Sequence, residues 1–100
     1  MEKEENTKIL RLPISEPWFS MILSGEKTEE YRDLTPFYTV RLDKKPTEIE
    51  LTNGYGHHRP ALRAKISAVK VGVGREKWGA PKAKVYKICI GEILETRNLK

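Results

Sequence analysis

Cysteine is almost missing from this sequence. Cys89 is the single copy, which excludes an intramolecular disulfide and a cysteine-based zinc site. No internal repeat, low-complexity run or linker rich in proline and glycine is present, so no domain boundary is expected. One hundred residues suffice for one compact core. We therefore predict a flexible N-terminal tail over residues 1–8 and a single domain over residues 9–100.

Long hydrophobic runs are absent as well. The longest apolar patch, around residues 18–23, is far too short to span a bilayer. Residues 1–6 are acidic and polar, which is unlike a signal or transit peptide. Together with the single cysteine, these features predict a cytoplasmic protein that does not insert into a membrane. No residue pattern indicates a metal site or a cofactor.

Acidic side chains are scarce in the second half of the chain. Residues 1–50 carry eight basic and eleven acidic side chains, whereas residues 51–100 carry eleven basic and three acidic ones. Between Arg59 and Lys87, nine basic side chains accompany a single acidic one, Glu76. Such a block predicts a positive face that attracts polyanions. The alternative is a set of solvated edge strands, because lysine on an edge strand also deters aggregation.

Short segments in which polar and apolar residues alternate, separated by turn formers, follow residue 28 and predict strands. A further strand is predicted near the N-terminus, so the predicted strands are residues 9–14, 28–33, 38–42, 48–52, 62–73 and 86–94. The apolar phase changes from even to odd positions at Ala68 and Val69, which predicts a β-bulge there. No helix-length connection separates the strands after residue 28, which disfavours a parallel sheet.

An apolar segment that begins at Trp18 predicts one early helix. Ser15 or Glu16 is the expected cap, Pro17 is tolerated in the first turn, and Gly25 ends the helix in the left-handed conformation. Apolar side chains cover most of the circumference, so we expect a largely buried helix that holds the Trp18 ring edge near a cleft. The fold class is mainly β with one or two short helices, arranged as a small closed or partly open barrel.

The segment after Gly25 holds the densest group of functional side chains. Lys27, Glu30 and Arg32 place two cations and a carboxylate within six positions. In a plain strand Glu30 and Arg32 share a face, whereas one turn over residues 27–30 brings Lys27 against Glu30 and all three into one pocket. Arg32 would then offer a planar fork to a phosphate or a base edge. The alternative is a surface salt bridge, which contributes little.

The same segment resembles the signature of the ASCH domain superfamily, a short helix followed by Gly-x-Lys-x-x-(Glu or Thr)-x-Arg. Gly25, Lys27, Glu30 and Arg32 match that pattern, and Pro17-Trp18-Phe19 precedes it. The resemblance covers roughly residues 9–95, because the segments 53–56 and 90–93 also fit the layout of the family. It implies a β-barrel related to the PUA fold, with Lys27, Glu30 and Arg32 in a cleft that binds RNA.

Some ASCH proteins are amidohydrolases that deacetylate N4-acetylcytidine with a lysine, a threonine nucleophile and a glutamate. Lys27 matches the lysine, but Glu30 occupies the position of the threonine. A carboxylate can position water as a base, yet it does not replace a hydroxyl nucleophile. The first hypothesis is therefore a module that binds single-stranded RNA or a modified nucleotide. The alternatives are a hydrolase of such nucleosides or of RNA, with Lys27 and Glu30 catalytic, and a protein-interaction domain with an incidental basic face.

A glycine-rich turn supplies a second candidate wall for the cleft. Asn53 offers hydrogen bonds to a base edge, Tyr55 and His58 can stack on bases, and Arg59 adds positive charge. The alternative is an ordinary hairpin loop with an aromatic plug. Trp78 lies in a basic loop, where it is either a further stacking platform or a buried anchor for the loop.

Overall fold

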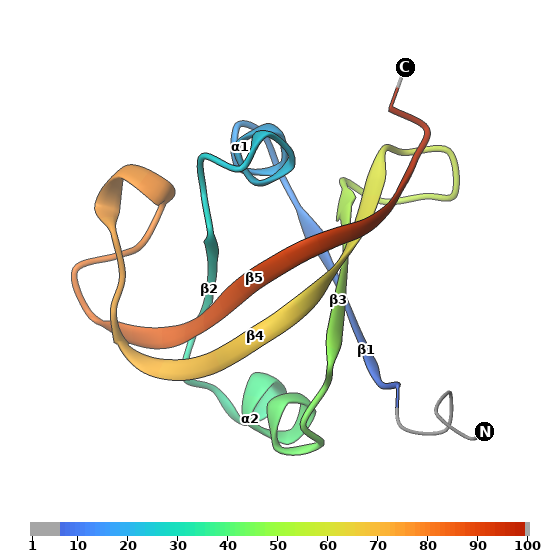
Figure 1. The fold of residues 1–100 in the computed structure, drawn as a ribbon. Helices are drawn as coiled ribbons and strands as arrows, with labels where there is room; N and C mark the ends of the chain where they lie inside the picture. Colours follow the sequence, from blue (N-terminus) through green and yellow to red (C-terminus); the bar gives the residue numbers. More distant parts are fainter. Residues whose placement is uncertain (1–6, 100) are drawn as a thin grey trace.

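The computed structural model describes residues 7–99, which form a five-stranded mixed β-sheet with two short helices (Figure 1). The elements follow one another as β1 (Ile9–Ile14), α1 (Trp18–Ser24), β2 (Glu29–Arg32), α2 (Pro36–Asp43), β3 (Glu48–Asn53), β4 (Ala61–Val73), a 3-10 turn (Glu76–Trp78) and β5 (Lys84–Arg97). Residues 1–6 of the predicted tail lie outside the described residues. None of the helices within residues 7–99 combines the length and the apolar character needed to cross a membrane.

The strands are arranged in the order β1-β3-β4-β5-β2. β1 and β3 run parallel, from Ile9 opposite Glu48 to Ile14 opposite Asn53, and the other pairs are antiparallel. The mainly β fold class is thus confirmed, and the sheet is mixed. Within the described residues no strand pairing joins β1 to β2, so the sheet does not close into a barrel.

β4 and β5 form a long, strongly twisted hairpin that extends beyond the other strands (Figure 1). Their register shifts three times between Arg63 and Ala68. The β-bulge predicted near Ala68 is therefore present, together with further irregularities closer to β3. Such shifts bend a strand and increase its twist, which curls the sheet around its core.

The strand predicted over residues 38–42 is wrong, because these residues belong to α2. Thr35 precedes the helix in an extended conformation, and Pro36 occupies its first turn, where a fixed φ and a missing N–H are tolerated. Tyr38 and Leu42 are four residues apart and turn inward, whereas Val40 is 54% exposed. Two of the three alternating apolar residues, Tyr38 and Leu42, therefore share the inner face of the helix, and the third faces solvent.

The predicted helix is confirmed as α1, but its start differs from the expectation. Pro17 is the capping residue and makes no side-chain cap, while Glu16 accepts hydrogen bonds from the backbone and hydroxyl of Ser20 at 3.3 and 2.9 Å. Gly25 ends the helix with a φ of 90°, as predicted, and donates its N–H to the carbonyl of Ile22.

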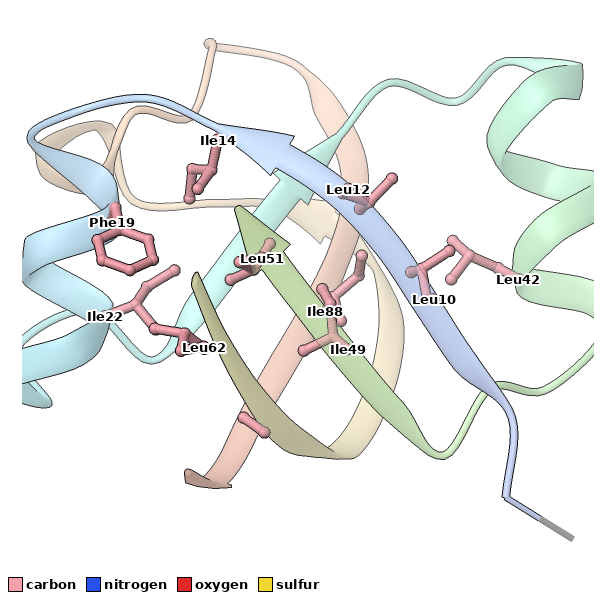
Figure 2. Close-up of a cluster of buried hydrophobic side chains, with 11 residues drawn as sticks. Leu10, Leu12, Ile14, Phe19, Ile22, Leu42, Ile49, Leu51, Leu62 and Ile88 are labelled. Atoms are coloured by element: carbon pink, nitrogen blue, oxygen red, sulfur yellow. The ribbon is translucent and has the colours of Figure 1, made fainter. Parts of the chain in front are cut away.

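The core lies inside the curl of the sheet (Figure 2). α1 reaches it with Phe19 and Ile22, and α2 reaches it from the other end with Leu42. Ile49 and Leu51 of β3 are fully buried at its centre. Each such side chain contributes roughly 1.5–3 kcal/mol through burial. This core fixes β1 and α1 against β3, and pairing with β5 holds β2 in place. β1, α1 and β2 are the elements that carry the candidate site.

Candidate ligand-binding cleft

A cleft of about 370 Å³ opens where the two edge strands face each other. Its lining comes from β1, α1, β2 and the loops that follow β1 and β3, namely Pro13, Ile14, Ser15, Trp18, Glu30, Arg32, Gly54 and Tyr55. Side chains, not strand pairing, bridge the opening between β1 and β2. Arg32 Nη2 donates to the carbonyl oxygen of Pro13 at 2.8 Å.

Arg32 is held from several sides at the floor of the cleft. Its Nε and Nη2 donate to the same oxygen of Glu30 at 3.1 and 2.7 Å, and its Nη1 donates to the Tyr38 hydroxyl at 3.3 Å. Burial opposes the charge, but Glu30 and Tyr38 outweigh it and raise the pKa of Arg32. A guanidinium has five N–H groups. Four of them are occupied within the described residues, so Arg32 does not present the open fork predicted for a phosphate.

Glu30 lies between two cations and is 7% exposed. Its second oxygen faces Lys27 Nζ at 3.4 Å, three residues away along the chain. Glu30 and Arg32 share a face of the strand, as one of the two alternatives predicted, and Lys27 meets Glu30 as the other predicted, but no turn covers residues 27–30. The local cause is the left-handed Gly25, after which the Lys27 N–H returns to the carbonyl of Met21 at 3.0 Å before β2 begins.

Lys27 is buried behind this floor, with 2% of its surface exposed. Its Nζ donates to the carbonyl oxygen of Trp78 at 2.7 Å and lies 4.5 Å from the ring centroid of Tyr31 and 5.5 Å from that of Trp18. Burial lowers the pKa of Lys27, and the neighbouring Glu30 opposes that shift. Lys27 is not among the residues that line the cleft, so a ligand there meets Glu30 and Arg32 first.

The two tryptophans have different positions. Trp18 is half-buried and lines the cleft, as expected, whereas Trp78 is 8% exposed and anchors its loop through the bond to Lys27. The buried ring of Trp78 does not offer an open stacking face. Gly79 has a φ of +95°, and a Cβ there would lie 2.9 Å from the Trp18 ring. The basic loop therefore packs directly against the cleft's tryptophan.

The turn after β3 forms the opposite wall. Tyr55 lines the cleft and is 83% exposed, so its ring is available to a ligand. The side-chain amide of Asn53 already has a partner, because its Nδ2 donates to Glu16 at 2.8 Å. Arg59 donates from Nε to the Asn53 carbonyl at 2.7 Å and packs over the turn. His58 is exposed and does not line the cleft.

The basic block of residues 59–87 is divided by the fold. Arg63 is paired with Glu48 and Glu95, and Lys65 and Lys87 also have carboxylate partners. No carboxylate within residues 7–99 lies within 4 Å of the other six, which are Arg59, Lys70, Arg75, Lys77, Lys82 and Lys84. The uncompensated charge therefore lies at the far end of the hairpin, in residues 70–84, and at Arg59 beside the turn.

Four contributors to the site did not stand out in the sequence. Pro13, Ile14 and Ser15 line the cleft, and Tyr38 holds Arg32 from α2. The Pro13 contribution is a backbone carbonyl, for which no side-chain pattern exists. Tyr38 could have been found only by recognising the Thr-Pro start of α2.

Comparison of the chain with protein-family models, curated proteins and solved structures finds no match. The likeness to the ASCH superfamily therefore remains a resemblance carried by the residues described above.

Proposed function

We propose that this chain is an ASCH-like, PUA-related cytoplasmic domain that binds single-stranded RNA or a nucleotide-like ligand in the cleft between β1 and β2. One observation carries the proposal: a single cleft combines the Glu30–Arg32 ion pair with the rings of Trp18 and Tyr55. Its volume of about 370 Å³ suits a small-molecule or nucleotide site. The curled sheet with its unpaired edges then corresponds to an open form of the family barrel.

Each group has a separate part in this proposal. Trp18 and Tyr55 stack on bases, which is the usual way that proteins hold unpaired nucleotides. Glu30 accepts a hydrogen bond from the amino group of a base. Arg32 positions Glu30 and offers its remaining N–H. Phosphates are met by the uncompensated cations on either side of the cleft, Arg59 beyond the turn and residues 75–84 behind Trp18.

The hydrolase alternative has weaker support. Both oxygens of Glu30 already face cations, and Lys27 is buried away from the cleft. A general base must reach the proton that it removes. Binding therefore agrees better with this geometry than proton transfer by Lys27 or Glu30.

Fluorescence anisotropy with a labelled single-stranded RNA at several salt concentrations tests the proposal. We expect a log–log slope of roughly −2 to −4, since each phosphate contact contributes about −0.7. The double variant Arg75→Ala, Lys77→Ala should lose about 1.4 of that slope. Lys65→Ala is the matched control, because Lys65 already pairs with Glu92. A salt-independent response, or no binding at low salt, would refute the proposal.

An assay on N4-acetylcytidine separates binding from hydrolysis. We expect no turnover by the wild-type protein. Robust turnover that Glu30→Gln abolishes would replace the binding function with an enzymatic one.

A further inference from the structure

The far half of β4 has an unpaired edge. β3 pairs with β4 only from Ala61 to Lys65, whereas β5 follows β4 as far as Val73. The last bond on the β3 side is the one from the Ile66 N–H to the carbonyl of Thr47, at 2.9 Å. Residues 67–73, here called the β4 edge, have no second strand beside them among the described residues. Alternate backbone N–H and C=O groups of an antiparallel strand then point outward.

A groove of about 400 Å³ runs beside the β4 edge. Leu42 and Pro46, from α2 and the loop after it, contribute to its lining, and Val69 and Val71 contribute from β4. Ile66, Ala68 and Tyr86 add to the apolar part of the lining, and its charged residues are Asp43, Lys45 and Lys70, two cations and one carboxylate. In Figure 1 the far half of β4 passes α2 with no strand between them. An extended segment laid in this groove would add to the sheet.

The two faces of the β4 edge differ in chemistry. Val69, Val71 and Val73 alternate along one face and are 40, 57 and 58% exposed. Lys70 points to the other face and is paired in register with Lys87. An added strand would therefore meet valines on one face and Lys70 on the other. The complementary segment alternates apolar and acidic side chains.

Charge also argues against a second copy of this chain as the occupant. Two β4 edges paired about a two-fold axis would bring two Lys70 side chains together, and like charges across a strand pair are destabilising. An edge that is protected against pairing usually carries charged residues or proline, whereas this edge exposes three valines.

We propose that the β4 edge binds an extended acidic segment of a partner protein by β-strand addition. The backbone of the segment pairs with residues 67–73, its apolar side chains enter the groove beside Val69 and Val71, and a carboxylate meets Lys70. This surface shares no lining residue with the cleft, so the inference stands apart from the proposed RNA binding.

A capped seven-residue peptide in which valine alternates with glutamate is the probe, and the matched peptide replaces glutamate with lysine. In an NMR titration of the whole chain at low salt we expect a dissociation constant below about 1 mM for the acidic peptide only, within the range of weak specific binding. Backbone amides of residues 67–73 should gain protection from hydrogen exchange. N-methylation of alternate peptide residues should abolish binding.

Charge reversal supplies the matched variants. Lys70→Glu should weaken the acidic peptide at least tenfold and admit the lysine peptide. Lys82→Glu, in the loop outside the groove, should leave both affinities unchanged. No binding of the acidic peptide at 1 mM, equal binding of both peptides, or protection at the cleft instead of residues 67–73 would overturn the proposal. So would self-association that protects residues 67–73 without peptide, or protection of those residues by single-stranded RNA.

Discussion

Lys27 and Lys82 are the same amino acid in opposite surroundings. Lys27 is 2% exposed, with its Nζ hydrogen-bonded to a carbonyl, facing Glu30 and enclosed by two aromatic rings. Lys82 is exposed in the loop between β4 and β5, and no described carboxylate pairs with it. The two lysines contribute equally to net charge, yet only Lys82 is free to meet a polyanion. Burial therefore separates the cations that support the fold from those that can bind.

The two arginines Arg32 and Arg75 repeat the contrast. Arg32 bridges β1, β2 and α2 through bonds to Pro13, Glu30 and Tyr38. Arg75 is exposed and its guanidinium lies 5.0 Å from the buried ring of Trp78. Removal of a buried, paired charge leaves its partner unpaired in a poor solvent, whereas removal of an exposed one costs little.

The largest effect should come from Lys27→Ala. The change removes a packed stem and leaves the Trp78 carbonyl and one oxygen of Glu30 without their partner, so we expect a loss of about 3 kcal/mol in unfolding free energy. The melting temperature should fall by about 15 °C. Thermal and urea unfolding measure both.

Lys82→Ala is the matched control, with an expected change within about 0.5 kcal/mol. Lys27→Met keeps an unbranched apolar side chain of nearly the same length without the charge and should recover part of the loss. Equal stability of Lys27→Ala and Lys82→Ala would contradict this comparison. Lys27 would then have no special role in the fold and would be free to bind a polyanion.

Glu30→Gln should have the next largest effect. It leaves Lys27 and Arg32 without their shared counter-charge, at an expected cost of about 2 kcal/mol in unfolding free energy. The comparison variant is Glu92→Gln, because Glu92 forms an exposed pair with Lys65 and should cost less than about 0.5 kcal/mol. If urea unfolding gives both variants the same midpoint, the buried pair has no special role in stability.

Tyr55→Ala should change binding and not stability. The ring is 83% exposed, so its loss removes little packing, whereas loss of a stacked base contact costs about 1–3 kcal/mol of binding free energy. We expect RNA affinity to fall at least fivefold at constant salt, with an unchanged melting temperature. Unaltered affinity would exclude Tyr55 from the binding surface.

The smallest effect concerns pH. Burial, reinforced by Glu29, raises the pKa of Tyr31 to about 12. The native state therefore keeps this proton between pH 10 and 12, where the unfolded chain releases it. The stability that Tyr31 contributes is complete below pH 10 and declines as the pH rises towards 12. The stability advantage of the wild type over Tyr31→Phe should be smaller at pH 11 than at pH 9, as urea unfolding would show; a constant difference would contradict this.

Local patterns were sufficient for much of the fold. The segments now called β1, β2 and β3 were predicted with boundaries within about a residue, as was the helix that ends at Gly25. Alternation and turn formers act over a few residues, so they can be identified without knowing the rest of the chain. The failure at α2 has a local cause too. Polarity alternates over only five residues, and the first and last of them also share one face of a helix.

By itself, the sequence determined the mainly β class and the early helix. Each depends on spacing along a continuous backbone. Only the tertiary structure decided which cations are open, because Lys27 is buried by Trp78, 51 residues away, and Arg63 is neutralised by Glu48 and Glu95 from two other strands. Burial and pairing depend on segments that the fold brings together, and charge counted along the chain cannot report them.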